Sequence, residues 1–206
     1  MRNHEAVPEE TMQRMLGYLR ELDCMLQEGK ETFSSQNLAE TLHVNPAQVR
    51  KDFSHFGEFG TRGVGYDTEQ LARELRAILK LDRTWPLALI GVGNIGSALL
   101  RSPELKRQGF NVVLAFDKDP HRVGKRLGKV TVEDVSCVTE RMREERIELA
   151  VIATPIECAQ NLADELILAG IKGILCFAPC HLRIPAEVRI VSIDIPMALG
   201  QLVYRL

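Results

Sequence analysis

The stretch "LALIGVGNIGSALL", residues 87–100, decides what the second half of the chain can be. An apolar run typical of a buried strand ends at Gly91, and the residues after Gly96 have the apolar spacing of a helix. In a G-x-G-x-x-G turn the first glycine permits the tight turn, the second lets the backbone approach a phosphate, and the third lets helix and strand pack closely. The stretch therefore favours a dinucleotide-binding turn. The alternative is a glycine turn that serves packing alone.

A second apolar run, "NVVLAF" at 111–116, supports the dinucleotide interpretation because it ends in Asp117, 21 residues after Gly96. An acid at this place accepts a hydrogen bond from a ribose hydroxyl, and together with Asp119 it would repel a 2′-phosphate. NAD(H) is therefore favoured over NADP(H). Three neighbouring basic or titratable residues leave that preference open: Lys118, His121 and Arg122.

Further apolar runs alternate with segments of helical pattern: "LAVIAT" (149–154), "GILCFA" (173–178) and "RIVSID" (189–194). Such an alternation predicts a parallel sheet with helices on both faces. Before about residue 80 the apolar residues instead recur at helical spacing, so the first half should be mostly helical. The seam between the two halves is expected within residues 79–86.

The totals of the 206-residue chain are those of an ordinary globular protein, with 45% apolar and 26% charged residues. No apolar run is long enough for a membrane span, and the polar, acidic beginning of the sequence is unlike a signal peptide, so we expect a cytoplasmic protein with no membrane partner. Five cysteines, an odd number, indicate reduced thiols. The net charge is −2, and residues 1–83 carry 11 Lys+Arg against 14 Asp+Glu, so any basic surface must be local.

The segment "TFSSQNLAETLHVNPAQVRKDFSHF", residues 32–56, has the pattern of two short helices joined by a turn. Ser34 or Ser35 can cap the first helix, and Asn45 can cap the second, with Pro46 at its first position. This is the pattern of a helix-turn-helix. On the second helix four polar side chains can project away from the apolar face: Gln48, Arg50, Lys51 and Ser54. Gln and Arg suit base edges in the major groove, whereas Lys and Ser suit phosphates.

An isolated Arg-Lys pair is more often a solvated charged face than a DNA contact. Here the following stretch "FGEFGTRGVGY", residues 56–66, changes that judgement, because its glycines permit a tight hairpin that carries Arg62. A hairpin of this kind can act as a wing that rests on the DNA backbone or enters the minor groove. The phenylalanines at 53, 56 and 59 are expected in the core.

The segment "SSQNLAETLHVNPAQVRKDFSHFGEFGTRGVGY" closely resembles the winged-helix signature of the bacterial Rex redox-sensing transcriptional repressors. The stretches "GVGNIGSALL", "AFDKDP", "AGIKGILCFAP" and "SIDIPMALGQLVYRL" continue the resemblance over nearly the whole chain. The resemblance implies a homodimer in which a winged helix (1–83) binds an inverted-repeat operator and a Rossmann-type parallel-sheet domain (84–195) binds NAD/NADH. It also implies that a C-terminal helix (196–206) is exchanged between the subunits and that high NADH releases the DNA.

The resemblance also implies which residues form the sites. The expected DNA contacts are Ser34, Ser35, Gln48, Arg50, Lys51, Ser54, Arg62, Gly63 and Tyr66. The expected cofactor contacts are Gly91, Val92, Gly93, Asn94, Ile95, Gly96, Asp117, Lys118, Ala153, Thr154 and Pro155. No catalytic residue and no metal site is expected.

The sequence departs from the family where nicotinamide state should be coupled to DNA release. Ser102 stands where the family usually has a tyrosine, and Ile195 follows Asp194 where the family usually has a phenylalanine. Arg14 and Asp194 are retained for the intersubunit ion pair that the resemblance implies, and Cys176 replaces an asparagine. We therefore expect cofactor binding to be kept better than NADH sensing.

Other constellations are weaker candidates. Cys176, Cys180 and His181 lie close together in the sequence, but their spacing is not C-x-x-C and no second ligand pair follows. Four carboxylates resemble catalytic pairs but are expected in solvated helical stretches: Glu133, Asp134, Glu144 and Glu145. An NAD-dependent enzyme, or a CoA-type or nucleotide-binding subunit with a helical extension, is the alternative function. The effector can be NADH, NAD or another adenine nucleotide.

Overall fold

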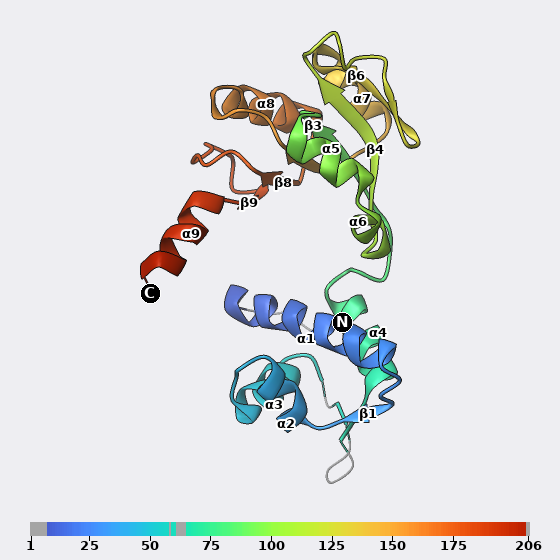
Figure 1. The fold of residues 1–206 in the computed structure, drawn as a ribbon, viewed down its shortest axis with the longest axis vertical. Helices are drawn as coiled ribbons and strands as arrows, with labels where there is room; N and C mark the ends of the chain where they lie inside the picture. Colours follow the sequence, from blue (N-terminus) through green and yellow to red (C-terminus); the bar gives the residue numbers. More distant parts are fainter. Residues whose placement is uncertain (1–7, 58, 61–64, 205–206) are drawn as a thin grey trace. The chain divides into compact units, whose positions relative to one another are not determined.

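The computed structural model describes residues 8–57, 59–60 and 65–204. The chain divides into two compact units, residues 1–83 and 84–206 (Figure 1). Two of the expected wing residues, Arg62 and Gly63, lie outside the described residues.

The first unit packs helices around one apolar core and adds a two-stranded antiparallel sheet. Its elements are α1 (Glu9–Gln27), β1 (Thr32–Phe33), α2 (Ser35–Thr41), α3 (Pro46–Ser54), β2 (Tyr66–Asp67) and α4 (Thr68–Ile78). The core is contributed by all four helices and includes Met15, Leu22, Leu38, Val49, Phe53, Leu71 and Leu75. Phe53 is buried as expected, and Phe56 and Phe59 pack against the same core.

Local sequence signals set the boundaries of α2 and α3. The Ser34 hydroxyl accepts from the amide of Asn37, and the Asn37 side chain accepts from the amide of Ser34, which forms a capping box. Asn45 accepts from the amide of Ala47, and Pro46 occupies the first turn of α3. Between the helices His43 has a φ of +53°, which reverses the chain. The expected helix-turn-helix is confirmed.

The second unit is a seven-stranded sheet in the order β5-β6-β4-β3-β7-β8-β9. Every pairing in it is parallel except that of β5 with β6. Its strands are β3 (Trp85–Ile90), β4 (Phe110–Asp117), β5 (Arg126–Leu127), β6 (Val130–Asp134), β7 (Leu149–Ile152), β8 (Gly173–Cys176) and β9 (Arg189–Ser192). Its helices are α5 (Asn94–Arg101), α6 (Pro103–Arg107), α7 (Val138–Glu144), α8 (Ile156–Ala169) and α9 (Ile195–Tyr204), with a short 3-10 turn η1 (Val135–Cys137).

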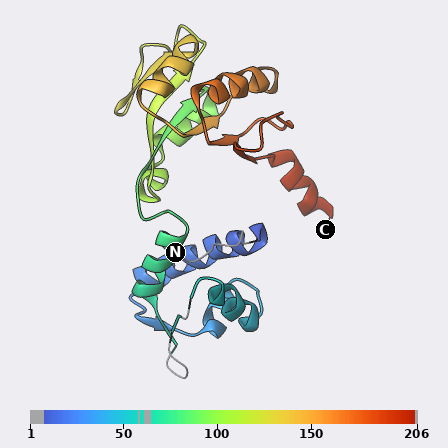
Figure 2. The same ribbon diagram turned by 180° about the vertical axis from the view of Figure 1, so that it is seen from behind.

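Helices cover both faces of this sheet (Figures 1 and 2). Alternate residues of β3 face opposite sides: Ala88 and Ile90 join the cluster that includes α7 and α8, whereas Leu87 and Leu89 join the cluster that includes α5. A parallel sheet covered on both faces must be apolar on both, which explains the uninterrupted apolar run of this strand. The expected Rossmann-type α/β fold is confirmed.

One sequence expectation about this unit is wrong. Glu133 and Asp134 do not lie in a helix but end strand β6, where they pair in register with Phe116 and Asp117 of β4. The alternation "VTV" is too short to have been separated from the surrounding charges by pattern alone. Glu144 ends α7 and Glu145 follows it, as expected.

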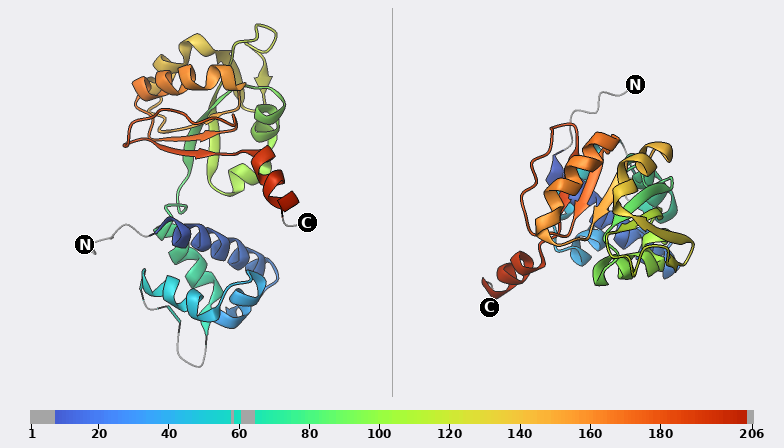
Figure 3. Two further views of the ribbon diagram at one scale, coloured as in Figure 1. Left: turned by 90° about the vertical axis from the view of Figure 1, so that its left-hand side faces the viewer. Right: turned by 90° about the horizontal axis from the view of Figure 1, so that it is seen from above.

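Helix α9 follows the edge strand β9 and buries none of its residues in this chain (Figure 3). Asp194 begins it by accepting a hydrogen bond from the amide of Met197 at 2.8 Å. Its large exposed apolar side chains are Ile195, Met197, Leu199, Leu202, Val203 and Tyr204. An apolar surface of this kind is typical of an interface with another chain. Among the described helices, none has the length and apolar character needed to cross a membrane.

Candidate functional sites

The three glycines of the turn after β3 are required for different reasons. Gly91 has a φ of +91°, and a Cβ atom there would lie 2.7 Å from the carbonyl oxygen of Ala153. A Cβ atom at Gly96 would overlap the carbonyl oxygen of Gly91. At Gly93 the φ is negative and a Cβ atom would meet only the guanidinium of Arg122, at 3.8 Å. The protein itself therefore needs glycine at 91 and 96, whereas Gly93 leaves space.

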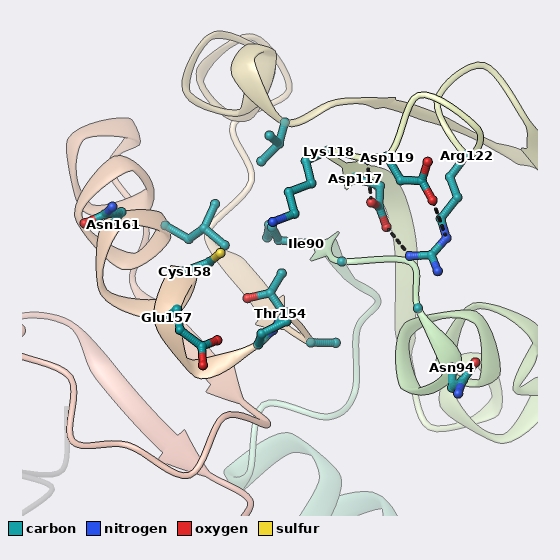
Figure 4. A pocket seen from close by; sticks show the side chains of 16 residues that line it. Ile90, Asn94, Asp117, Lys118, Asp119, Arg122, Thr154, Glu157, Cys158 and Asn161 are labelled. Carbon is teal, nitrogen blue, oxygen red and sulfur yellow. Dashed lines mark hydrogen bonds and ion pairs between the residues drawn. The ribbon is translucent and has the colours of Figure 1, made fainter.

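This space belongs to a pocket of about 860 Å³ at the carboxyl ends of β3, β4 and β7 (Figure 4). It lies where the chain order reverses between β3 and β7, which is the place where open parallel sheets bind ligands. Its lining residues are Ile90, Gly91, Gly93, Asn94, Asp117, Lys118, Asp119, Arg122, Val135, Ala153, Thr154, Pro155, Glu157, Cys158, Asn161 and Leu162.

Asp117 ties the end of β4 to the glycine turn. Its Oδ2 atom accepts from the amide of Val92 at 2.7 Å and from Arg122 at 3.1 Å, and its Oδ1 atom accepts from the amide of Asp119 at 2.9 Å. Burial raises the pKa of this carboxyl, but the hydrogen bonds from Asp119, Val92 and Arg122 outweigh that effect and hold the pKa below its usual value. Asp117 is thus a buried anion that fixes the turn.

Asp119 is the more accessible carboxylate at this end of the pocket, with 38% of its side chain exposed. It lies 3.6 Å from Arg122, and the Lys118 side chain extends into the pocket (Figure 4). The sequence analysis assigned the ribose contact to Asp117 and considered Arg122 only as a charge. In the structure, Arg122 bridges the two carboxylates beside the glycine turn.

The opposite wall of the pocket contains an unpaired polar atom. The Thr154 hydroxyl oxygen is buried and, within the described part of the chain, has no hydrogen-bond partner. Buried hydroxyls are rarely left unpaired, so this atom can pair with a polar ligand group or a water in the pocket. Glu157, Cys158 and Asn161 of α8 also line this wall, and the sequence analysis missed them. The sequence does contain a signal for these three residues, because they lie in the first turns of the helix that follows the "ATP" sequence at 153–155.

A second candidate site lies on the helix-turn-helix. Arg50 and Lys51 are exposed on α3, and Arg50 donates to the hydroxyl of Ser35 at 3.0 Å, which joins the start of α2 to α3. The Ser54 hydroxyl donates to the carbonyl of Lys51 at 2.7 Å. Ser35, Arg50 and Lys51 thus form one exposed polar surface, and Ser34 serves as the cap of α2.

Gln48 differs from these residues because its amide turns toward a buried ion-pair network. Asp52 of α3 is fully buried and accepts from Gln48 at 2.8 Å, from Arg14 at 2.7 and 2.8 Å, and from the Tyr18 hydroxyl at 2.8 Å. Burial raises the pKa of Asp52, but the hydrogen bonds from Arg14, Tyr18 and Gln48 prevail and lower it. This network fixes α3 against α1.

Tyr66, the last residue of the expected hairpin, is half-buried in β2. Its ring stacks on Phe33 with centroids 5.3 Å apart and meets Phe53 edge-on at 5.4 Å. The adjacent Gly65 has a φ of +105°, and a Cβ atom there would lie 2.5 Å from the carbonyl oxygen of Phe33. Glycine is thus needed at position 65 because the backbone there runs directly against β1.

Three of the four expected switch residues make a contact within this chain, and the fourth is exposed. Arg14 pairs with Asp52, and Asp194 caps α9. The Ser102 hydroxyl accepts from the amide of Leu105 at 3.4 Å and so caps α6. Ile195 is 54% exposed.

The remaining sequence candidates are the cysteines and the metal ligands. Cys176 is fully buried at the end of β8, and burial raises the pKa of its thiol. Within residues 8–57, 59–60 and 65–204, no group of three or more His, Cys, Asp and Glu side chains is arranged to hold a metal ion.

The helix-turn-helix exposes Arg50 and Lys51, and the Rossmann-type unit has a pocket large enough for a nucleotide. Together they define a class of regulators with one DNA-binding part and one nucleotide-binding part. Comparison with protein families supports both parts. Residues 6–54 match the family described as "Putative DNA-binding protein N-terminus", and residues 82–180 match the CoA binding domain family.

Relatives match the chain over nearly its full length. A redox-sensing transcriptional repressor Rex of Chloroflexus aurantiacus is 39% identical over 206 residues, which is all of this chain and 97% of the relative. One from Syntrophobacter fumaroxidans is 40% identical over 201 residues, with 97% of this chain and 96% of the relative covered. The chain belongs to the Rex family of redox-sensing transcriptional repressors.

Solved structures of one repressor, RSP, have the same fold. The crystal structure of RSP in complex with β-NAD⁺ and operator DNA superposes with a TM-score of 0.92 at 34% identity, covering 97% of this chain and 92% of that one. RSP in complex with β-NADH gives a TM-score of 0.90 at 32% identity, covering 97% and 94%.

Proposed function

We propose that this protein represses transcription by binding operator DNA through residues 1–83 and that NAD(H) bound by residues 84–206 controls this binding. The observation that carries the proposal is the full-length similarity to RSP. One RSP structure contains β-NAD⁺ and operator DNA, and another contains β-NADH. The relatives are named as repressors, so an enzymatic function is not favoured.

The pocket residues fit a dinucleotide. Gly93 leaves the backbone open to a close-lying phosphate, and the cationic side chains of Lys118 and Arg122 lie beside it. Asp119 offers an accessible carboxylate for a ribose hydroxyl, and the unpaired Thr154 hydroxyl offers a hydrogen-bonding group at the other wall. Asp117 acts indirectly, because its hydrogen bond to the Val92 amide fixes the turn.

The nicotinamide ring supplies the redox signal, since it is positively charged when oxidised and neutral when reduced. The protein must convert that difference into a change in DNA affinity, and a ligand does so only through unequal affinity for two conformations. Arg14 and Asp194 are proposed to take part in this coupling, and Ser102 and Ile195 stand at the coupling positions where the family usually has aromatic residues. We also propose that the exposed apolar face of α9 is covered by a second copy of the chain, so that the repressor is a homodimer.

On the DNA side, Arg50 is the proposed base-reading residue and Lys51 the proposed phosphate contact. Both are exposed on α3, and the Ser35 hydroxyl orients the Arg50 guanidinium. Gln48 retains its carbonyl oxygen for a base while its amide group is held by Asp52. Because operator DNA and the NAD(H) pool occur together in the cytoplasm, we place the protein there.

A selection from random duplexes tests this proposal. Full-length protein should enrich one inverted-repeat sequence, and NADH should elute the enriched duplexes. Recovery of unenriched DNA, or elution by salt but never by NADH, would contradict the proposed function.

A further inference from the structure

Two cysteines that belong neither to the dinucleotide pocket nor to the helix-turn-helix lie at the end of β8 and in the loop after it. Cys176 is the last residue of the strand, and Cys180 follows after "FAP". The Cys176 thiol donates to the carbonyl oxygen of Ala178 at 3.7 Å, and the Cys180 amide donates to the same oxygen at 2.8 Å. One carbonyl oxygen therefore accepts from the thiol of the first cysteine and from the backbone amide of the second.

The turn that produces this arrangement is short. A hydrogen bond from residue 180 to residue 178 closes a three-residue turn around Pro179, which reverses the chain immediately after the strand. Cys180 consequently packs back against the apolar cluster that contains Cys176. Burial raises the pKa of the Cys176 thiol, and the neighbouring Cys180 thiol adds to this rise.

We propose that Cys176 and Cys180 form a reversible disulfide when the protein meets a peroxide. Cys180 is partly exposed and lines a cavity of about 410 Å³, whereas Cys176 is fully buried. The Cys180 thiolate attacks one peroxide oxygen, the O–O bond breaks and a sulfenic acid forms, while the departing hydroxide takes up the proton that the Cys180 thiol released and leaves as water. The Cys176 sulfur then attacks the Cys180 sulfur, the S–S bond forms, the S–O bond breaks, and the departing hydroxide takes up the thiol proton as water. Two thiols lose two electrons, and the peroxide is reduced to two waters.

The disulfide would form at the root of α9. The carbonyl of Cys176 accepts from the amide of Ile193 at 2.8 Å, just before the cap of that helix. Cys180 shares its cavity with Asp194, Met197 and Gln201. Moving the Cys180 sulfur toward Cys176 changes the wall of the cavity that Cys180 shares with Asp194, so we expect the thiol state to affect the cap of α9.

The chain offers a convenient test, because trypsin cleavage after Lys172 and Arg183 releases one peptide that contains both cysteines and no other. Full-length protein is treated with hydrogen peroxide, denatured, alkylated and digested. We expect this peptide to lose both alkylation sites together, to be lighter by two hydrogens, and to recover both sites after dithiothreitol. The exposed Cys24 is the internal control, because it should form no bond to another cysteine within the chain.

Two variants identify the roles of the two thiols. In Cys180→Ser, Cys176 should remain fully alkylated at the same peroxide concentration. In Cys176→Ser, a sulfenic acid should accumulate on Cys180 and be trapped by dimedone. The proposal is overturned if native protein keeps both alkylation sites while Cys24 is oxidised, or if Cys180 is found joined to a different cysteine.

Hydrogen exchange tests the link to α9. The Met197 amide, which donates to Asp194, should exchange several-fold faster in oxidised native protein than in peroxide-treated Cys180→Ser. Equal exchange in the two samples, with the disulfide present in the native one, would overturn the link between the thiols and the helix.

Discussion

The side-chain amide of Gln48 donates to the buried carboxylate of Asp52 at 2.8 Å, so a residue expected to read bases is held by its own helix. The same carboxylate accepts from Arg14 and Tyr18 of α1. Asp52 therefore links the orientation of Gln48, a proposed DNA contact, to the packing of α3 on α1.

Replacing Asp52 by Asn should lower the free energy of unfolding by about 2 to 3 kcal/mol, because Arg14 loses its charged partner and one buried acceptor becomes a donor. Denaturant unfolding of the full chain measures this change. The matched control is Asp82→Asn, an exposed position in the same unit, which should stay within about 0.5 kcal/mol. Equal stability of the two variants would contradict the network.

The pH dependence of this difference follows from the lowered pKa of Asp52. The folded state depresses the pKa below the ordinary value of 3.8, so the stabilisation is complete above that value. It is lost as the pH falls below 3.8 toward the folded-state pKa. The gap in stability between native protein and Asp52→Asn should therefore be constant near neutral pH and narrow below about pH 4.

Arg50→Ala and Lys51→Ala should weaken operator binding in different ways. Loss of a guanidinium that pairs with a base should cost about 1 to 3 kcal/mol and relax specificity at one position. Loss of a phosphate contact should weaken binding to all duplexes alike. It should also reduce the slope of log affinity against log salt concentration by about one. Titrations against the operator and a scrambled duplex at several salt concentrations separate the two cases. Unchanged operator affinity in Arg50→Ala would mean that α3 does not read the groove as proposed.

Gly93→Ala separates ligand binding from folding. The added Cβ meets only the Arg122 guanidinium at 3.8 Å, so unfolding should change by less than about 0.5 kcal/mol. Dinucleotide affinity measured by calorimetry should nevertheless fall at least tenfold, about 1.4 kcal/mol, because the backbone approach is blocked. Gly124→Ala is the comparison, since its φ is +80° with open space around it and only backbone strain is added. Full NADH affinity in Gly93→Ala would place the phosphates elsewhere.

The sequence predicted the helix-turn-helix and the parallel sheet because both depend on local signals. Caps at Ser34 and Asn45, and apolar strands such as 87–90, are visible in the residues themselves. The hairpin of β5 and β6 was missed because its pairing depends on a neighbouring strand rather than on its own short pattern. The sequence also could not show the partners of Asp52 and Arg122, since these contacts are made by tertiary packing.

The departures from the family should reduce the response to NADH. An allosteric effector typically changes the affinity for a second ligand about 5- to 150-fold. Because two aromatic groups are absent from the coupling positions, we expect the effect of NADH on operator affinity to lie near the low end of that range. Ser102→Tyr with Ile195→Phe should enlarge the NADH effect on operator affinity. Ser102→Ala is the control, because it removes only the cap of α6. An NADH effect above about 100-fold in the native chain would show that other residues carry the coupling.

NADH control of DNA binding is tested by the affinity of full-length protein for its selected inverted repeat, measured by fluorescence anisotropy at one fixed salt concentration. It is measured alone, with saturating NAD and with saturating NADH. We expect specific binding that NADH weakens about 5- to 10-fold and that NAD weakens less. Operator affinity that is the same in all three conditions, or no greater than for scrambled DNA, would contradict it.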